Sequence, residues 1–244
     1  MTILFCSLSE GKNTFTAGLT RQDTGNMFIS LEGIEGSGKS TQIRHICDLL
    51  NESGVKCAMT REPGGTNIGK KIRSILLDPE SAIMDPYTEL LLYTADRIQH
   101  IREIICPLIN NGNVVICDRY FDATLAYQGV ARGLDTAIIL NLHQLICRNL
   151  KPDLTFLLDL PPHIGLSRAW KQLKNGCRPD AESRFEKETL VFHERVRSGY
   201  LELAEKEPDR FRIIDASQSE PQVREQIAVI LRTELLLSDS HHND

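Results

Sequence analysis

The chain has 244 residues, of which 41% are hydrophobic and 25% charged, and its formal net charge is −5. These values are typical of a soluble globular domain, and no stretch approaches the roughly 18 apolar residues of a membrane span. The acidic balance argues against a general nucleic-acid-binding protein, which usually carries a basic surplus. We therefore expect one large domain with neither a membrane nor a nucleic acid as a partner.

The two ends of the chain differ in composition from the rest. Residues 1–26 are rich in Thr, Ser, Gly and Asn and lack the features of a secretory signal, so we expect a flexible extension. The predicted domain spans residues 27–236, and residues 237–244 are expected to form a disordered tail. Seven cysteines, never closer than ten residues, allow neither a full disulfide set nor CxxC zinc pairs. They favour a reducing cytoplasm.

Apolar runs bounded by turn residues alternate with helical periodicity along the domain. The segment 39–54 has an apolar helical stripe that stops at a glycine, and 85–109 is a longer helical segment with a proline near its start. This alternation predicts an α/β fold, a five-stranded parallel sheet with helices on both faces and ligands outside the carboxyl ends of its strands. The predicted strands are at about 27–32, 56–60, 113–117, 153–159 and 211–215.

A glycine-rich loop follows the first predicted strand and precedes the first helix. Gly33, Gly38, Lys39 and Ser40 fit the pattern G-x-x-x-x-G-K-[ST], in the context that indicates a phosphate-binding loop. Its backbone N–H groups and the helix dipole favour phosphate, Lys39 would reach the outer phosphates, and Ser40 is the natural Mg²⁺ ligand. The predicted nucleotide-binding residues are Gly33, Ile34, Glu35, Gly36, Ser37, Gly38, Lys39, Ser40 and Thr41.

A carboxylate and several arginines follow other predicted strands and helices. Asp118 ends the run "NVVICD" and is the carboxylate expected to help hold magnesium, usually through water, in a nucleotide-binding protein. The guanine-reading pattern N-K-x-D of GTPases is absent from the sequence. A kinase that acts on a small anion needs further cations for the acceptor. The candidates are Arg61, Arg73, Arg97 and Arg119.

Five segments together resemble the thymidylate kinase family of P-loop nucleoside monophosphate kinases. They are "FISLEGIEGSGKSTQ", "TREPGGT", "LLYTADR", "DRYFDATLAYQG" and "LDLPPHIGLSRA", and they occur in the family's order over roughly residues 27–232. The resemblance implies the P-loop nucleoside monophosphate kinase fold and a homodimer packed through helices. The apolar "ELLLY" helix fits such an interface and equally fits a buried core face. The resemblance also implies transfer of the γ-phosphoryl group of ATP to dTMP, with Mg²⁺, which gives dTDP for dTTP synthesis.

The resemblance also implies roles for individual residues at the acceptor site. Arg73 and Arg119 match the arginines that hold the dTMP phosphate, a task that suits forked guanidinium groups. Tyr93 takes the place of the ring that stacks on thymine, and Tyr127 that of the tyrosine under the sugar, which excludes a 2′-hydroxyl. The acidic loop residue Glu35 is expected to face the 3′-hydroxyl. The predicted base contacts are Arg97, Thr124 and Gln128.

The segment of about residues 171–186 is the predicted lid. The loop interior "IEGS" lacks the arginine that one branch of the family places there, so the lid must supply the catalytic charge. We expect Arg178 to do so, with Arg168 and Arg184 as alternatives. Ser183 stands where the family often has an acidic residue, whereas Glu186 keeps the second acidic position and is a candidate magnesium ligand.

Two other functions remain open at this point. One is a kinase of another nucleoside monophosphate or of a deoxynucleoside. The other is an ATP-binding regulatory protein that has lost turnover. The presence of Lys39, Ser40, Asp118 and two acceptor arginines argues against the second.

Overall fold

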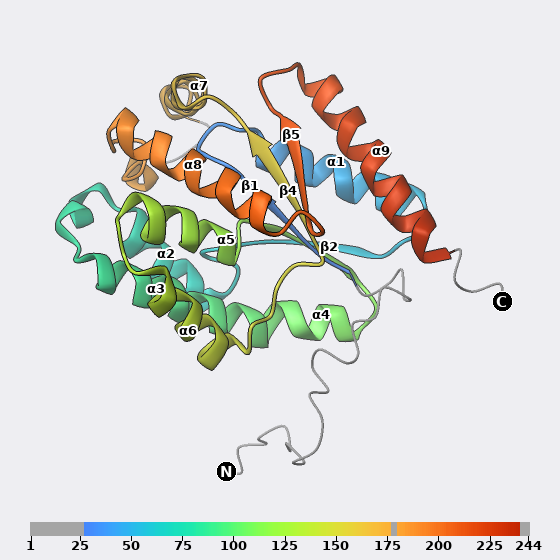
Figure 1. Cartoon of the computed structure of the whole chain (residues 1–244), viewed down its shortest axis with the longest axis horizontal. Helices are drawn as coiled ribbons and strands as arrows, with labels where there is room; N and C mark the ends of the chain where they lie inside the picture. Colours follow the sequence, from blue (N-terminus) through green and yellow to red (C-terminus); the bar gives the residue numbers. More distant parts are fainter. Residues whose placement is uncertain (1–26, 177–179, 240–244) are drawn as a thin grey trace, which may run out of the picture.

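The computed structural model describes residues 27–176 and 180–239, and within them the chain forms one sheet of five parallel strands. The strand order is β2-β3-β1-β4-β5 (Figure 1). All five predicted strands are confirmed, each within one residue of its predicted bounds. The strands are β1 (Phe28–Glu32), β2 (Cys57–Arg61), β3 (Val114–Asp118), β4 (Leu154–Asp159) and β5 (Phe211–Asp215).

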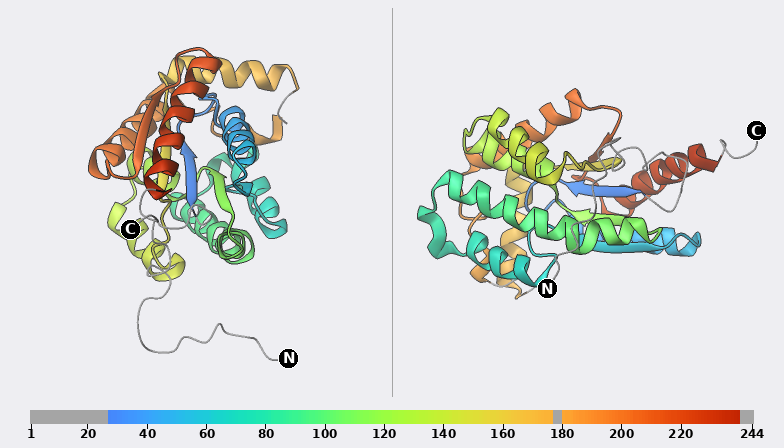
Figure 2. Two further views of the ribbon diagram at one scale, coloured as in Figure 1. Left: turned by 90° about the vertical axis from the view of Figure 1, so that its right-hand side faces the viewer. Right: turned by 90° about the horizontal axis from the view of Figure 1, so that it is seen from below.

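Helices cover both faces of this sheet, as predicted. Helices α1 and α9 lie side by side over one face, whereas α8 lies on the other (Figures 1 and 2). Helix α9 ends three residues beyond the predicted domain boundary at 236. The helices are α1 (Lys39–Glu52), α2 (Asn67–Leu77), α3 (Pro86–His100), α4 (Cys106–Asn110), α5 (Phe121–Thr124), α6 (Thr136–Cys147), α7 (Pro162–Lys174), α8 (Leu190–Lys206) and α9 (Glu220–Asp239).

The central strand β1 is buried on both sides because alternate residues point to opposite faces of a strand. Ile29 and Leu31 pack in the cluster that contains the apolar side chains of α1. Phe28 packs in the cluster formed with α3, α4 and α6. Both layers therefore position the carboxyl end of β1, where the glycine-rich loop begins.

The predicted helical segment 85–109 forms one continuous helix that is interrupted by a π-helical turn. Asp85 caps it by accepting hydrogen bonds from the N–H groups of Tyr87 and Thr88, at 2.9 and 3.2 Å. Between α3 and α4 the turn Ile101–Ile105 is π-helical. Pro107 lies two residues after this turn, and proline can neither donate the usual helical hydrogen bond nor fit against the preceding turn.

A disulfide joins Cys47 on α1 to Cys57 on β2, with Cα atoms 5.9 Å apart. The cysteine spacing does not predict this pair, and the expectation of a reducing environment gives no reason for it. The two positions meet because the chain reverses at Gly54, which adopts φ 77°, and β2 then runs back beside α1. Within the part of the chain that the structure describes, no helix has both the length and the apolar character needed to cross a membrane.

Candidate functional site

The glycine-rich loop folds tightly between the end of β1 and the start of α1. A side chain at Gly36 would collide with the carbonyl oxygen of Gly165 on α7. Gly38 immediately precedes α1 and has φ 97°, a left-handed conformation that favours glycine. The loop therefore delivers the N-terminal N–H groups of α1 to the carboxyl edge of the sheet, where they are placed to bind an anion.

Lys39 is the first residue of α1 and is buried. Its Nζ donates to the carbonyl oxygens of Gly33 and Ile34, both at 2.9 Å. Burial, with the nearby charge of Arg119, lowers the pKa of Lys39 to about 8. A bound phosphate would favour the charged ammonium. The site thus suits a lysine whose positive charge is stabilised when an anionic ligand binds.

Ser40 and Asp118 meet at the ends of α1 and β3. The Ser40 hydroxyl donates to Oδ2 of Asp118 at 3.1 Å. Oδ1 of Asp118 is buried and accepts no hydrogen bond from the described residues. An unpaired buried oxygen beside a hydroxyl fits Mg²⁺, which prefers oxygen ligands and keeps several waters. Glu186, the third predicted ligand, lines the same cavity, and its role as a ligand stays a prediction.

Arg119 links the phosphate loop to the predicted sugar-binding residues. Its backbone has φ 66°, a conformation that non-glycine residues rarely adopt and that often marks a functional site. Its Nη2 donates to Oε1 of Glu35 at 2.9 Å and to the hydroxyl of Tyr127 at 3.0 Å. Burial raises the pKa of Glu35, but Arg119 and His193 outweigh it, so the pKa lies below its usual range and the carboxylate stays charged.

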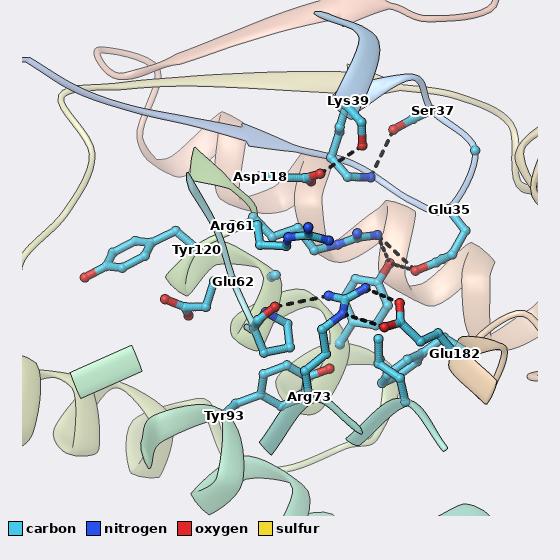
Figure 3. A pocket seen from close by; sticks show the side chains of 18 of the residues that line it. Glu35, Ser37, Lys39, Arg61, Glu62, Arg73, Tyr93, Asp118, Tyr120 and Glu182 are labelled. Carbon is cyan, nitrogen blue, oxygen red and sulfur yellow. Dashed lines mark hydrogen bonds and ion pairs between the residues drawn. The ribbon is translucent and has the colours of Figure 1, made fainter. Parts of the chain in front are cut away.

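Arg73 reaches the same cavity from α2. Its Nε and Nη2 donate to the two carboxylate oxygens of Glu182, at 3.2 and 2.7 Å, and its Nη1 donates to the Pro63 carbonyl at 3.1 Å. Figure 3 shows this guanidinium facing Glu182. A two-point pair with a carboxylate presents the geometry with which arginine also binds phosphate.

The residues predicted to bind the base form the far end of the cavity. Tyr93 and Arg97 lie one turn apart on α3, and both line it. Gln128 also lines the cavity and lies in the π-helical segment Leu125–Ala131. Arg97 is 2% exposed, and its guanidinium contacts Glu62 at 2.5 Å and donates to Thr124 at 2.8 Å. The Arg97 guanidinium is therefore fixed in one orientation.

The side chains predicted to bind the two nucleotides line one cavity with a volume of about 510 Å³. In Figure 3, Ser37, Lys39 and Asp118 lie at one end, and Arg73 and Tyr93 lie at the other. Every predicted nucleotide-binding and substrate-binding residue lines this cavity, except Gly33 and Ile34. Those two instead bind Lys39 through their carbonyl oxygens.

The sequence profile of the family described as Thymidylate kinase matches residues 31–227. The chain belongs to the thymidylate kinase family. A thymidylate kinase from Desulfosudis oleivorans is 54% identical over 190 residues, which cover 78% of this chain and 89% of that protein. Another, from Syntrophotalea carbinolica, is 52% identical over 192 residues, 79% and 88% of the two chains.

The same family appears among solved structures. The crystal structure of thymidylate kinase from Ehrlichia chaffeensis is 32% identical in sequence, with a TM-score of 0.67, and the match covers 85% of this chain and 99% of that one. The resemblance to the thymidylate kinase family is thus confirmed, and so is the P-loop nucleoside monophosphate kinase fold that it implied.

Two of the three arginines predicted to supply the catalytic charge bind other parts of this thymidylate kinase family member. Arg168 on α7 donates to the carbonyl oxygen of Ala216 at 3.0 Å. Arg184 is 4% exposed and ion-paired at 2.5 Å with Glu89 of α3, so its side chain anchors the C-terminal part of the predicted lid to α3. Arg178, the preferred candidate, lies outside the described residues.

Several charged residues of the site escape the sequence analysis because they hold the predicted residues rather than belong to a known pattern. Glu62 lies in the quoted segment "TREPGGT", directly after β2, and that position at a strand's carboxyl end could have indicated it. The other three lie on helical segments far from their partners in sequence. They are Glu89, Glu182 and His193.

Proposed function

We propose that this chain is a dTMP kinase that transfers the γ-phosphoryl group of Mg-ATP directly, in line, to dTMP and so forms dTDP, a step in dTTP synthesis. The observation that supports it most is the single cavity that joins a phosphate-binding loop to two further arginines, Arg73 and Arg119. Two phosphates can then be held face to face with their charges neutralised. The names of the relatives agree with this activity.

The donor side uses the loop and the first turn of α1. The backbone N–H groups and Lys39 would bind the β- and γ-phosphates of ATP. Ser40 and Asp118 would hold Mg²⁺, with Glu186 as a further candidate. When bound, the metal neutralises charge that develops on the donor phosphates. Lys39 gains a partner for its ammonium in the same step, so its pKa rises from about 8 on ATP binding.

The acceptor side holds a phosphate monoester. Its second pKa is near 6, so at neutral pH it is already largely dianionic and needs no strong general base. Arg73 and Arg119 would aim the attacking oxygen at the γ-phosphorus. The catalysis that we propose is therefore positioning and charge neutralisation, which fits a site with cations at both ends and no histidine among the residues that line the cavity in the described chain.

The nucleoside of dTMP would occupy the far end of the cavity. Tyr93 would stack on thymine, and Arg97, Thr124 and Gln128 would contact the edge of the base. Tyr127 would lie under the sugar and Glu35 would face its 3′-hydroxyl. The hydroxyl of Tyr127 already donates to Glu35 at 2.7 Å, so these two side chains form one surface for the sugar.

The lid, about residues 171–186, would supply the charge that the loop lacks. We propose Arg178 as the catalytic cation, because Arg168 and Arg184 bind other parts of the chain. Such an arginine contributes on the order of 10³ to 10⁵ in rate in related phosphoryl transfers.

Apolar side chains on two adjacent helices support a homodimer as well. Ile68 and Ile75 on α2 are about half exposed, and so are Tyr87 and Leu91 on α3, the helix that contains "ELLLY". Residues seven or four apart share a helix face. We propose that α2 and α3 pack against a second copy, which light scattering would show as twice 27.5 kDa. The place of action that we propose is the cytoplasm.

The proposed activity is tested by measuring ADP formation from Mg-ATP with dTMP, dUMP, UMP, dCMP, dGMP and thymidine as acceptors. We expect the highest kcat/KM with dTMP, a lower value with dUMP and negligible turnover with UMP, because Tyr127 would exclude a 2′-hydroxyl. Preference for another nucleotide or for thymidine would identify a different kinase. Binding of ATP without turnover of any acceptor would favour a regulatory protein.

A further inference from the structure

His193 on α8 is completely buried between the phosphate loop and the inner end of the lid. Its Nδ1 lies 3.2 Å from Oε2 of Glu35. Its Nε2 lies 3.0 Å from the carbonyl oxygen of Phe185. Carboxylate and carbonyl oxygens only accept hydrogen bonds, so each ring nitrogen faces a group to which it can donate. No part of the proposed reaction uses this histidine.

The two carboxylate oxygens of Glu35 have different partners. Oε1 of Glu35 accepts hydrogen bonds from Arg119 at 2.9 Å and from Tyr127 at 2.7 Å. The second oxygen, Oε2, is buried and accepts no hydrogen bond from the described residues, and its ion-pair partner is Nδ1 of His193. Contacts at one oxygen leave the carboxylate plane able to rotate about that point. A partner at the other oxygen fixes the plane, and with it the direction in which Glu35 can accept a further hydrogen bond.

The second nitrogen connects this carboxylate to the cavity wall. Phe185 lines the cavity, and its ring packs edge-on against Tyr127 with centroids 5.4 Å apart. His193 therefore contacts the backbone of Phe185, whose ring lies beside Tyr127 at the proposed sugar site. A single side chain thus contacts both the loop carboxylate and the lid end.

We propose that His193 is a positioning residue that fixes the Glu35 carboxylate for the 3′-hydroxyl of the acceptor and ties that orientation to the Phe185 end of the lid. The proposal rests on the proposed function, because it needs a nucleotide with a 3′-hydroxyl in the cavity. It makes Nδ1 the atom that matters for reading the hydroxyl, whereas Nε2 supports the lid end.

Three variants separate the two nitrogens. His193→Asn keeps a donor near the position of Nδ1, His193→Gln keeps one near Nε2, and His193→Leu keeps neither. For each, kcat/KM is measured with dTMP and with its 3′-deoxy analogue, and the ratio of the two values gives the contribution of the 3′-hydroxyl. We expect wild type and the asparagine variant to share a high ratio. The glutamine and leucine variants should lose about tenfold or more of it, as expected for a hydrogen bond to a charged group.

A purely structural histidine would behave differently. It would lower the melting temperature and the activity on both nucleotides together, and the ratio would stay constant. An unchanged ratio in an active enzyme, or equal losses in the asparagine and glutamine variants, would overturn the inference while the proposed function stands. Wild type that turns over no acceptor would overturn the proposed function itself.

A double-mutant cycle keeps the test independent of folding defects. If His193 acts through Glu35, then His193→Gln should cause no further loss of the ratio in a Glu35→Gln background. Additive losses in the double variant would contradict the inference.

Discussion

The ion pair between Arg73 and Glu182 predicts that dTMP binds against an internal competitor. Arg73 is proposed to hold the acceptor phosphate, yet its guanidinium is bound at two points by Glu182, in the 3₁₀ turn Asp180–Glu182 of the lid. The phosphate of dTMP must displace this carboxylate. Replacing Glu182 by glutamine removes the charge and keeps the size, so we expect the Glu182→Gln variant to bind dTMP more tightly.

The size of the effect follows from the exposure of the pair. The side chains are 19% and 27% exposed, between the buried and the fully solvated cases. A hydrogen bond to a charged group contributes about 1.5–3 kcal/mol when shielded, whereas exposed ion pairs contribute about 0–1 kcal/mol. An intermediate value of about 1–2 kcal/mol corresponds to a Kd for dTMP that is about 5–30-fold lower.

Isothermal titration with dTMP, without ATP, measures this difference directly. Glu188→Gln is the matched control, because Glu188 pairs with Arg132 at 2.6 Å, is similarly exposed and does not line the cavity. We expect the control to bind dTMP like wild type. Weaker binding by Glu182→Gln, or the same change in both variants, would refute the competition.

Three further predictions concern the loop lysine, the disulfide and the lid. Because the pKa of Lys39 is about 8, the Kd for Mg-ATP should be constant below pH 8 and rise about tenfold per pH unit above it, whereas a Lys39→Met variant should show no such rise. Reduction of the Cys47–Cys57 bond, which closes a ten-residue separation, should lower stability by about 2–3 kcal/mol and the Tm by about 5–10 °C in calorimetry, and Cys57→Ser should show no response to reductant. Arg178→Ala should lower kcat at least 100-fold with little change in the Kd for dTMP, whereas Arg184→Ala, which loses the Glu89 pair, should mainly lower the Tm.

The sequence predicts the parts of this protein that depend on local pattern. The strands end within a residue of their predicted bounds because each is a short apolar run closed by turn residues. The phosphate loop is predictable because glycines, lysine and serine must stand at fixed spacing between a strand and a helix. Asp118 and Arg119 follow from the same logic, since parallel strands bring their carboxyl ends to one edge.

The sequence does not predict contacts between segments that meet only in the folded chain. Glu182 and Arg73 are 109 residues apart, and no pattern reveals that one binds the other. His193 looks like an ordinary helix residue until α8 packs beside the loop. From the sequence, Arg184 is a candidate catalytic cation because nothing in the pattern distinguishes the arginines and lysines of the lid from one another. The structure shows that its guanidinium is buried against Glu89 and so has a structural role.

Transfer of label from [γ-³²P]ATP tests the central claim most directly. The protein is incubated with labelled ATP, Mg²⁺ and dTMP, and the products are separated. The account predicts that the label appears in dTDP at the rate of ADP formation, and that a Lys39→Ala variant transfers none. Label that appears in inorganic phosphate, or that stays in ATP while dTMP is unchanged, would contradict the proposal that this cavity joins the two nucleotides.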